Sequence, residues 1–192
     1  KDVMVIGIHQ PEHFPYLGFF QKMEKADLFV ILDDVQFTKN NFQNRNRFLN
    51  KNRVEEWFTI ELEPKPNKKL IKDIKVSENT KWRKKILSKL KTNFKGNFDE
   101  IYNEEKLIDI NLKSIEYCRK HLNISTPLKF SSQLNINTKS SQRLADICDY
   151  FKANEYISGI GGKEYLDESL FNCKINYFTP RISNYYTTLQ HL

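Results

Sequence analysis

The amino-acid sequence predicts an α/β fold, a single domain in which helices flank a mainly parallel sheet. Short apolar runs rich in β-branched residues, first at Val3–Ile8 and again at Leu28–Leu32, alternate with segments of helical periodicity, as in parallel sheets with helical crossovers. The first strand, loop, helix and second strand together span about 30 residues, the size of one βαβ unit. The 192 residues are enough for one substantial core.

The first half of the chain gives four elements in order. The strand Val3–Ile8 runs into the proline-containing loop HQPEHFPYLG and then into a short helix near Phe19–Lys25. A buried strand over Leu28–Leu32 ends on two acidic residues. Residues 36–53 are polar and rich in Asn and Arg, which predicts a structured loop, and the alternation over Glu56–Leu62 predicts another strand.

The second half continues the alternation of helices and strands. Apolar residues recur every four positions from Trp82 to Phe94, which predicts an amphipathic helix. The remaining elements are expected as helices over Thr80–Phe94 and Glu104–Leu122, a strand near Leu128–Ser131, a helix over Ser141–Phe151, a strand over Glu155–Ser158, a glycine loop over Gly159–Gly162, a helix over Lys163–Phe171 and a strand over Ile175–Phe178. We therefore expect one domain, residues 1–192, with a basic helical segment, about 65–122, inserted between sheet strands.

The formal charge of +7 is concentrated in one segment. Between Lys65 and Lys95 there are 12 Lys or Arg and 2 acidic residues, a composition that could bind the phosphates of a nucleic acid or nucleotide. The alternative is the solvated face of a helix. Because the basic residues are almost all Lys, whereas base-reading sites favour Arg, nucleic-acid binding is the least favoured function.

Cysteine usage and hydropathy predict a cytoplasmic protein. No apolar run approaches the ~20 residues of a membrane helix, and the first residues, KDVMVIGIHQ, resemble no secretory signal. The three cysteines form no CxxC pair, which favours a reducing compartment. The start at Lys1 rather than at Met is expected for a processed or trimmed chain.

Polar residues follow the first strand, where an open parallel sheet binds its ligands. His9, Gln10 and His13 lie in the loop between this strand and its helix. Imidazoles beside a helix N-terminus can donate hydrogen bonds to charge that develops on a phosphate or acyl oxygen. The alternative is that one of them caps the helix or satisfies a buried carbonyl. The spacing of these residues matches no zinc signature.

A second polar group follows the second strand. Asp33 and Asp34 point in different directions in an extended chain, so we expect at most one of them, with Gln36 nearby, to face a ligand; both could also be ordinary turn formers. In the run Asn44-Arg45-Asn46-Arg47, alternation places the two arginines on one side, where they could bind phosphate or carboxylate groups, and the two amides on the other.

A third group lies between a late strand and the helix expected at Lys163–Phe171. Its members are Ser158, Gly159, Gly161, Gly162 and Lys163. Glycines and a serine in such a loop can form a nest of backbone amides that suits an anion. The sequence is neither a P-loop nor a GxGxxG motif, and a plain glycine turn is the alternative.

Two long stretches of this chain resemble the WbqC-like protein family. They are IHQPEHFPYLGFFQKMEKADLFVILDDVQFTKNNFQNRNRF and EYISGIGGKEYLDESLF. The resemblance implies a cytoplasmic accessory enzyme of bacterial surface-polysaccharide biosynthesis, including O-antigen pathways with amino-sugar nucleotides. His13 stands where the family pattern would have an aromatic residue, which puts a catalytic role for it in doubt.

The activity implied is a transferase or ligase that attaches an acyl or amino-acyl group, for example glycyl, to a nucleotide-linked amino sugar. In this interpretation His9, with Arg45 and Arg47, stabilises charge, Asp33 or Asp34 orients hydroxyls or accepts a proton, and the glycine loop binds pyrophosphate. The strand and loop pattern is also similar to a Rossmann-like nucleotidylyltransferase, which suggests ATP with Mg²⁺ as a cofactor. The alternatives are a non-catalytic module that binds a sugar nucleotide or a partner, and nucleic-acid binding.

Overall fold

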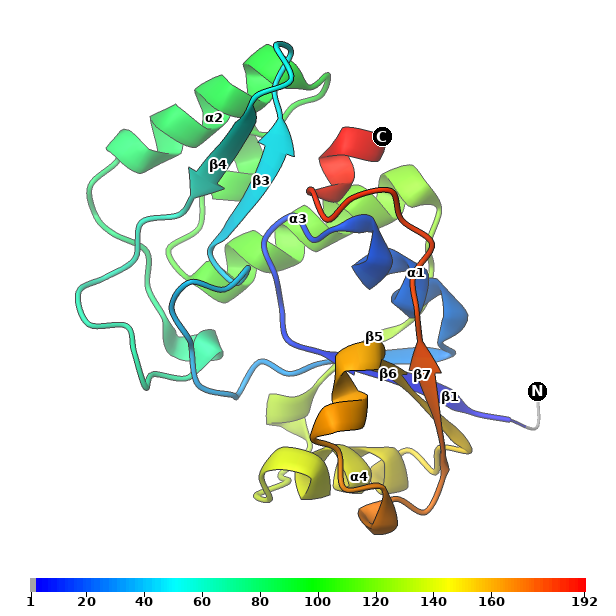
Figure 1. Cartoon of the computed structure of the whole chain (residues 1–192). Coiled ribbons are helices and arrows are strands. Elements are labelled where there is room, and N and C mark those ends of the chain that lie inside the picture. The colour runs from blue at the N-terminus through cyan, green and yellow to red at the C-terminus, as the bar shows by residue number, and fades with distance from the viewer. Residues whose placement is uncertain (1–2) are drawn as a thin grey trace. The chain divides into compact units, whose positions relative to one another are not determined.

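A computed structural model describes residues 3–192 and confirms the α/β prediction (Figure 1). In these residues the central sheet has five strands, all parallel, in the order β5-β2-β1-β6-β7. The strands are β1 (Val5–His9), β2 (Leu28–Ile31), β5 (Leu128–Phe130), β6 (Glu155–Gly159) and β7 (Lys174–Phe178). The α-helices are α1 (Leu17–Lys25), α2 (Lys81–Asn93), α3 (Leu107–Leu122) and α4 (Ser140–Tyr150). None of the helices in residues 3–192 combines the length and apolar character that a bilayer crossing requires.

The chain forms two compact units. The sheet unit comprises the described residues up to Gln10, together with Gly18–Asp33 and Ile124–Ile182. The hairpin unit comprises Pro11–Leu17, Asp34–Asn123 and Ser183–Leu192. The expectation of one domain over residues 1–192 stays a prediction.

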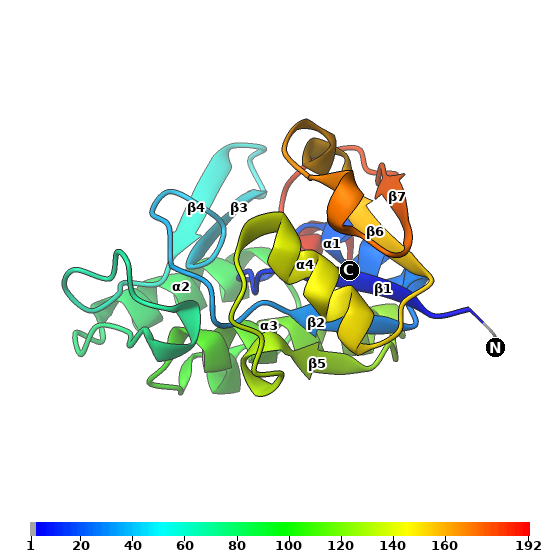
Figure 2. The ribbon, with the colours of Figure 1, turned by 90° about the horizontal axis from the view of Figure 1, so that it is seen from below.

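The sheet unit is built around the predicted βαβ motif. Strands β1 and β2 pair in parallel, with Ile6 opposite Leu28, and nearly all of their side chains are buried. Gly7 is required by packing, because a Cβ there would lie 2.9 Å from the Phe29 ring. The two helices of this unit, α1 and α4, cover opposite faces of the sheet (Figures 1 and 2), because the crossovers that contain them run in opposite directions along it.

The hairpin unit contains a two-stranded antiparallel sheet of β3 (Arg45–Leu49) and β4 (Glu55–Thr59). The prediction of a loop over residues 36–53 was therefore wrong for this strand. The reason is that a buried position of β3 carries a polar side chain, Asn46, so the strand lacks the usual apolar alternation. Helix α2 buries Trp82, Ile86 and Leu90, as its four-residue spacing predicts.

The helix expected over Lys163–Phe171 does not form. The chain there makes two short 3-10 turns, Ile160–Glu164 and Glu168–Leu170. Asp167 separates them, because its carboxylate accepts hydrogen bonds from the backbone N–H and the hydroxyl of Ser169, a local turn that competes with helical hydrogen bonding. The glycine loop is thus followed by no α-helix whose N-terminal dipole could attract an anion.

Candidate functional site

The sheet unit has a topological switch point at the carboxyl ends of β1 and β6. These strands are neighbours, with Gly7 opposite Ile157, and the same register brings His9 and Gly159 to adjacent strand ends. The chain continues from β1 to β2 on one side and from β6 to β7 on the other. The loops that follow β1 and β6 therefore run in opposite directions along the sheet. Open α/β sheets bind ligands at this point, which makes the end of β1, with His9, and the loop after β6 the candidate site of the sheet unit.

His9 presents a hydrogen-bond acceptor at this edge of the sheet. Its Nδ1 lies 2.8 Å from the carbonyl oxygen of Gln10. A carbonyl can only accept, so Nδ1 carries the proton and Nε2 holds a lone pair. Burial and the charge of Lys22 lower the pKa of His9 to about 3, although the bond to the Gln10 carbonyl opposes them. At neutral pH the ring is therefore neutral, and its Nε2 accepts rather than donates.

Lys22 is a polar residue at this edge that sequence reasoning missed. It lies in α1, is 6 % exposed, and its Nζ donates to the carbonyl oxygen of Ile8 at 2.8 Å. Its position on the helix indicates that it is buried, because Lys22 follows Phe19 by three positions and precedes Met23. All three side chains are buried. The sequence alone therefore shows a lysine on the apolar face of a helix that lies next to a strand end.

Asp33 connects the loops that follow β2 and β5. Its buried carboxylate accepts hydrogen bonds from the backbone N–H of Ser132 at 2.9 Å and from the hydroxyls of Ser132 at 2.6 Å and Ser131 at 3.3 Å. With three donors on one carboxylate, Asp33 holds the loop after β5 in place. Asp34 is partly buried and belongs to the hairpin unit.

In the glycine loop after β6, two glycines have free space beside the backbone and one is closely packed. A Cβ at Gly162 would lie 2.3 Å from Oγ of the buried Ser158, whereas Gly159 and Gly161 have no atom within 4 Å of that position. Ser158 donates from Oγ to the carbonyl oxygen of Gly159 at 3.0 Å. Packing therefore explains the glycine at 162 only. Lys163 lies with its Nζ 5.4 Å from the centre of the Tyr177 ring.

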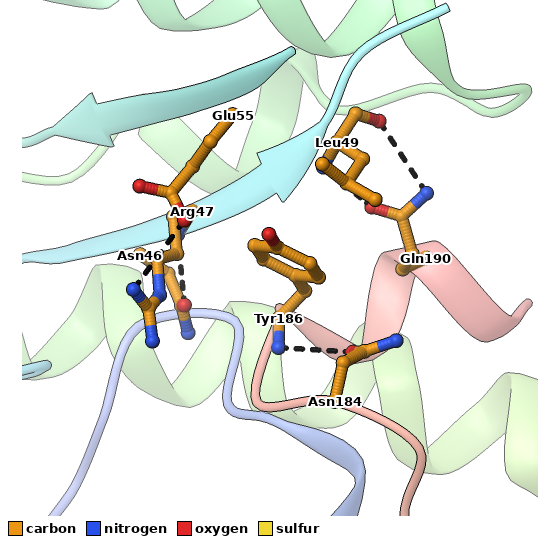
Figure 3. A network of polar contacts seen from close by, with 7 residues as sticks. All are labelled: Asn46, Arg47, Leu49, Glu55, Asn184, Tyr186 and Gln190. Carbon is orange, nitrogen blue, oxygen red and sulfur yellow. Dashed lines mark hydrogen bonds and ion pairs between the residues drawn. The ribbon is translucent and has the colours of Figure 1, made fainter. Parts of the chain in front are cut away.

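In the hairpin unit the two predicted arginines lie on one face of β3. Both guanidinium groups sit over the Trp57 ring, Arg45 at 4.4 Å and Arg47 at 5.4 Å from its centre. Arg47 also pairs with Glu55 at 3.4 Å and lies 5.7 Å from the ring of Tyr186. The C-terminal segment runs beside this strand (Figure 3), and the predicted alternation of β3 is confirmed.

Asn46, the one amide residue of β3, has a structural role. Asn46 is buried and donates to the carbonyl oxygens of His13 at 3.1 Å and Phe14 at 2.8 Å. Phe14 has a φ of 37°, a conformation that costs a non-glycine residue about 1–3 kcal/mol. Two hydroxyls also hold it: the Ser114 hydroxyl accepts from its N–H and the Thr187 hydroxyl donates to its carbonyl. These hydrogen bonds therefore hold the loop before α1 in a strained backbone conformation.

Of three further predicted residues, Gln10 adjoins His9 at the end of β1, whereas Asn44 and Gln36 belong to the hairpin unit. Asn44 donates to the carbonyl oxygen of Ile60 at 3.0 Å and supports the hairpin. Gln10 is partly buried at the end of β1, and Gln36 is exposed beside Leu70, with which it forms an isolated backbone bridge. Over residues 3–192, no three His, Cys, Asp or Glu side chains are grouped so that they could hold a metal ion.

His13 is fully buried among aromatic rings of the hairpin unit. Its Nε2 lies 2.7 Å from the hydroxyl of Tyr102, and the rings of Phe14, Phe58 and Tyr102 pack edge-on around it. Burial lowers the pKa of His13 to about 3, and the neighbouring side chain of Asn111 partly offsets this effect. This imidazole is neutral in the folded protein at neutral pH.

We expect His13 to make the protein sensitive to acid. Because its pKa is about 3 when folded and about 6.5 when unfolded, its contribution to stability is complete above pH 6.5 and is lost as the pH falls toward 3. Below about pH 5.5 that loss approaches 1.4 kcal/mol per pH unit. Urea unfolding of the wild type and His13→Gln between pH 7 and 4 measures it, and the variant's unfolding free energy should fall less steeply. Parallel pH profiles would contradict the prediction.

Comparison with known proteins gives one family and one relative. The sequence matches the model of the WbqC-like protein family over residues 10–191. It is also 29% identical over 180 residues to Uncharacterized protein Rv1507c of Mycobacterium tuberculosis, an alignment that covers 87% of this chain and 77% of that protein. No solved structure matches.

Proposed function

Because the chain belongs to the WbqC-like protein family, we propose that it is a transferase or ligase that attaches an acyl or amino-acyl group to the amine of a nucleotide-linked amino sugar. The setting is the cytoplasmic biosynthesis of a surface polysaccharide such as an O-antigen. The observation that carries the proposal is the neutral imidazole of His9, which has an acceptor nitrogen at the switch point of the sheet. The identity of the substrates rests on the family resemblance.

Such a transfer needs a base near the attacking amine. The neutral amine nitrogen forms a bond to the acyl carbon, the bond from that carbon to its leaving group breaks, and the amine loses one proton, which ends on the leaving group. His9 Nε2 is the acceptor through which that proton passes. Burial keeps the ring neutral, so Nε2 can accept a hydrogen bond from the amine at neutral pH. Because a pKa of about 3 makes the imidazole a weak base, the proton passes on to the leaving group without resting on the ring. The acyl donor reaches the site already activated, as a carrier-bound ester or through ATP with Mg²⁺.

The glycine loop is the proposed binding region for the diphosphate of the sugar nucleotide. The space beside Gly159 and Gly161 lets a phosphate approach the backbone N–H groups closely. Lys163, which lies in the same loop, adds a positive charge. These contacts need no helix dipole, in agreement with the 3-10 turn that replaces the expected helix.

A binding and turnover screen tests this function. The purified protein is heated with UDP- and dTDP-linked amino sugars, and a ligand at 100 times its dissociation constant should stabilise it by about 2.7 kcal/mol. The ligands that bind are then incubated with acyl thioesters, or with glycine, ATP and Mg²⁺. We expect a product heavier by one acyl or glycyl group in the mass spectrum. Binding with no product under either donor set would favour a non-catalytic binding module, and no binding at all would refute both.

A further inference from the structure

The hairpin of β3 and β4 has one buried face and one that is partly exposed. Phe48 and Phe58 are buried on the first face. Arg45, Arg47 and Trp57 lie together on the second, which we call the arginine face, because alternate residues of a strand share a face and Arg47 pairs with Trp57 across the hairpin. All three are only partly buried. The proposed reaction uses none of these side chains.

Aromatic rings fix the orientation of the two guanidinium groups. They lie 4.4 Å (Arg45) and 5.4 Å (Arg47) from the centre of the Trp57 ring, and Arg47 is also 5.7 Å from the centre of the Tyr186 ring (Figure 3). Stacking uses the flat surface of a guanidinium group and leaves the N–H groups, which lie in its plane, free to donate. The arginine face therefore offers a ligand preorganised hydrogen-bond donors, and its tryptophan ring is already covered.

Most of these donors have no acceptor within residues 3–192. Nε of Arg45 donates to the carbonyl oxygen of Asn41 at 3.3 Å, and its two terminal nitrogens bond to no group of the described chain. Nε of Arg47 is buried and has no hydrogen-bond partner there, which is unfavourable for an N–H group. Nη1 of Arg47 lies 3.4 Å from Glu55, whose side chain is 40% exposed, and such an ion pair is weak. The pair of arginines thus combines positive charge with unused donors.

The spacing and charge of the pair suit a phosphate group. Two positions along a strand are separated by ~6.6 Å, a distance that one phosphate can bridge between two guanidinium groups. A carboxylate has two oxygens and one charge, which a single guanidinium fork satisfies. A phosphate has three free oxygens and up to two charges, and therefore needs a second fork.

We propose that Arg45 and Arg47 together bind a phosphate group of a ligand on the arginine face. The phosphate takes the place of Glu55 at Arg47 and accepts hydrogen bonds from both guanidinium groups. These residues belong to the hairpin unit, whereas His9 and the glycine loop belong to the sheet unit. The proposal therefore does not depend on the proposed reaction.

Tryptophan emission tests this site. Trp57 lies against both guanidinium groups, and the other tryptophan, Trp82, also belongs to the hairpin unit. At constant ionic strength, we expect inorganic pyrophosphate to change the emission in a saturable way, and acetate to bind at least tenfold more weakly. Trp57→Phe should abolish the change in emission. UDP that binds more tightly than pyrophosphate would identify the ligand as a nucleotide, and equal affinities would show that the phosphate groups alone are bound.

Matched variants separate this site from general attraction of anions. Arg45→Lys and Arg47→Lys keep the charge but lose the planar fork, so each should weaken pyrophosphate binding about tenfold or more. Arg53→Lys changes an exposed arginine of the same hairpin and should leave the affinity unchanged. Glu55→Gln removes the competing carboxylate and should strengthen binding, an effect that a purely structural arginine pair would not produce.

Three outcomes would overturn this site. They are the absence of a saturable change in the wild type, equal affinities in the wild type and both lysine variants, and acetate that binds as tightly as pyrophosphate. An oligonucleotide that binds far more tightly than UDP, with a steep salt dependence, would replace the small ligand with a nucleic acid. Urea unfolding of each variant verifies its fold, and Arg47→Gln replaces a lysine variant that unfolds. Loss of acyl transfer with an intact emission titration would contradict the proposed function alone.

Discussion

Replacing His9 by alanine is expected to lower turnover of the acyl transfer by ~10²–10⁴-fold, the usual contribution of a positioned base. The reason is that Nε2 is the acceptor for the amine proton, while Nδ1 is held by the carbonyl of Gln10. The loss should fall on kcat more than on KM, since the proton moves only during the reaction. Product formation at saturating sugar nucleotide, followed by mass spectrometry, measures it.

A matched control exists in α3. His121 also places its Nδ1 2.8 Å from a backbone carbonyl, that of Tyr117, but it is exposed. His121→Ala should turn over like the wild type. If His9→Ala unfolds, His9→Gln keeps a polar side chain of similar reach and provides the test. A folded His9 variant with wild-type kcat would remove His9 from the mechanism.

The pH profile separates His9 from an ordinary histidine. Because burial and Lys22 lower the pKa of His9 to about 3, its protonation produces no loss of activity near pH 6.5. A loss of activity at that pH, absent from His9→Gln, would show that the ring titrates as an exposed imidazole does.

The sequence predicted the strands β1 and β2 of the central sheet well because both are buried on both faces. β1 and β2 are short, nearly continuous apolar runs, the composition that is typical of strands in a parallel sheet. Helix α2 was equally clear, since Trp82 and Ile86 are spaced for one buried face. In these elements local pattern and tertiary packing agree.

The features that the sequence analysis missed are those in which a buried polar side chain forms a hydrogen bond with the backbone of a distant residue. Asn46 breaks the apolar alternation of β3 because it holds the strained backbone of Phe14, a partner 32 positions away that no local pattern reveals. Lys22 has the same character, since its acceptor is the carbonyl of Ile8 on another element. Polar residues with distant partners look like surface residues when only neighbours in sequence are considered.

For the candidate site, the sequence indicated which loops to consider, but it did not indicate what their side chains do chemically. The rule that ligands bind at the carboxyl ends of parallel strands directed attention to His9 and the glycine loop, and the pairing of β1 with β6 places them at adjacent strand ends. The prediction could not show that the Gln10 carbonyl accepts a hydrogen bond from Nδ1–H of His9, and this bond leaves Nε2 as the acceptor of the ring. It also could not distinguish the glycines, because only the fold shows which of them touches Ser158.

Substitutions in the glycine loop are expected to separate an effect on stability from an effect on ligand binding. Gly162→Ala places a Cβ 2.3 Å from Ser158 Oγ, and the buried hydroxyl has to move. Overpacking of this kind costs about 1–3 kcal/mol. Gly161→Ala meets no atom within 4 Å and should change the free energy of unfolding by less than about 0.5 kcal/mol. Urea unfolding of both variants measures the difference.

The same pair of variants tests the proposed diphosphate contact. If the diphosphate lies against the backbone at Gly159 and Gly161, a methyl group at 161 occupies space that the ligand needs, so Gly161→Ala should raise the KM for the sugar nucleotide about tenfold or more while its stability is unchanged. A packing role alone would leave KM at the wild-type value, because the open side of the loop supports no protein contact that the methyl could disturb. Equal KM values for Gly161→Ala and the wild type would therefore remove the ligand from this loop, whatever Gly162→Ala does to the fold.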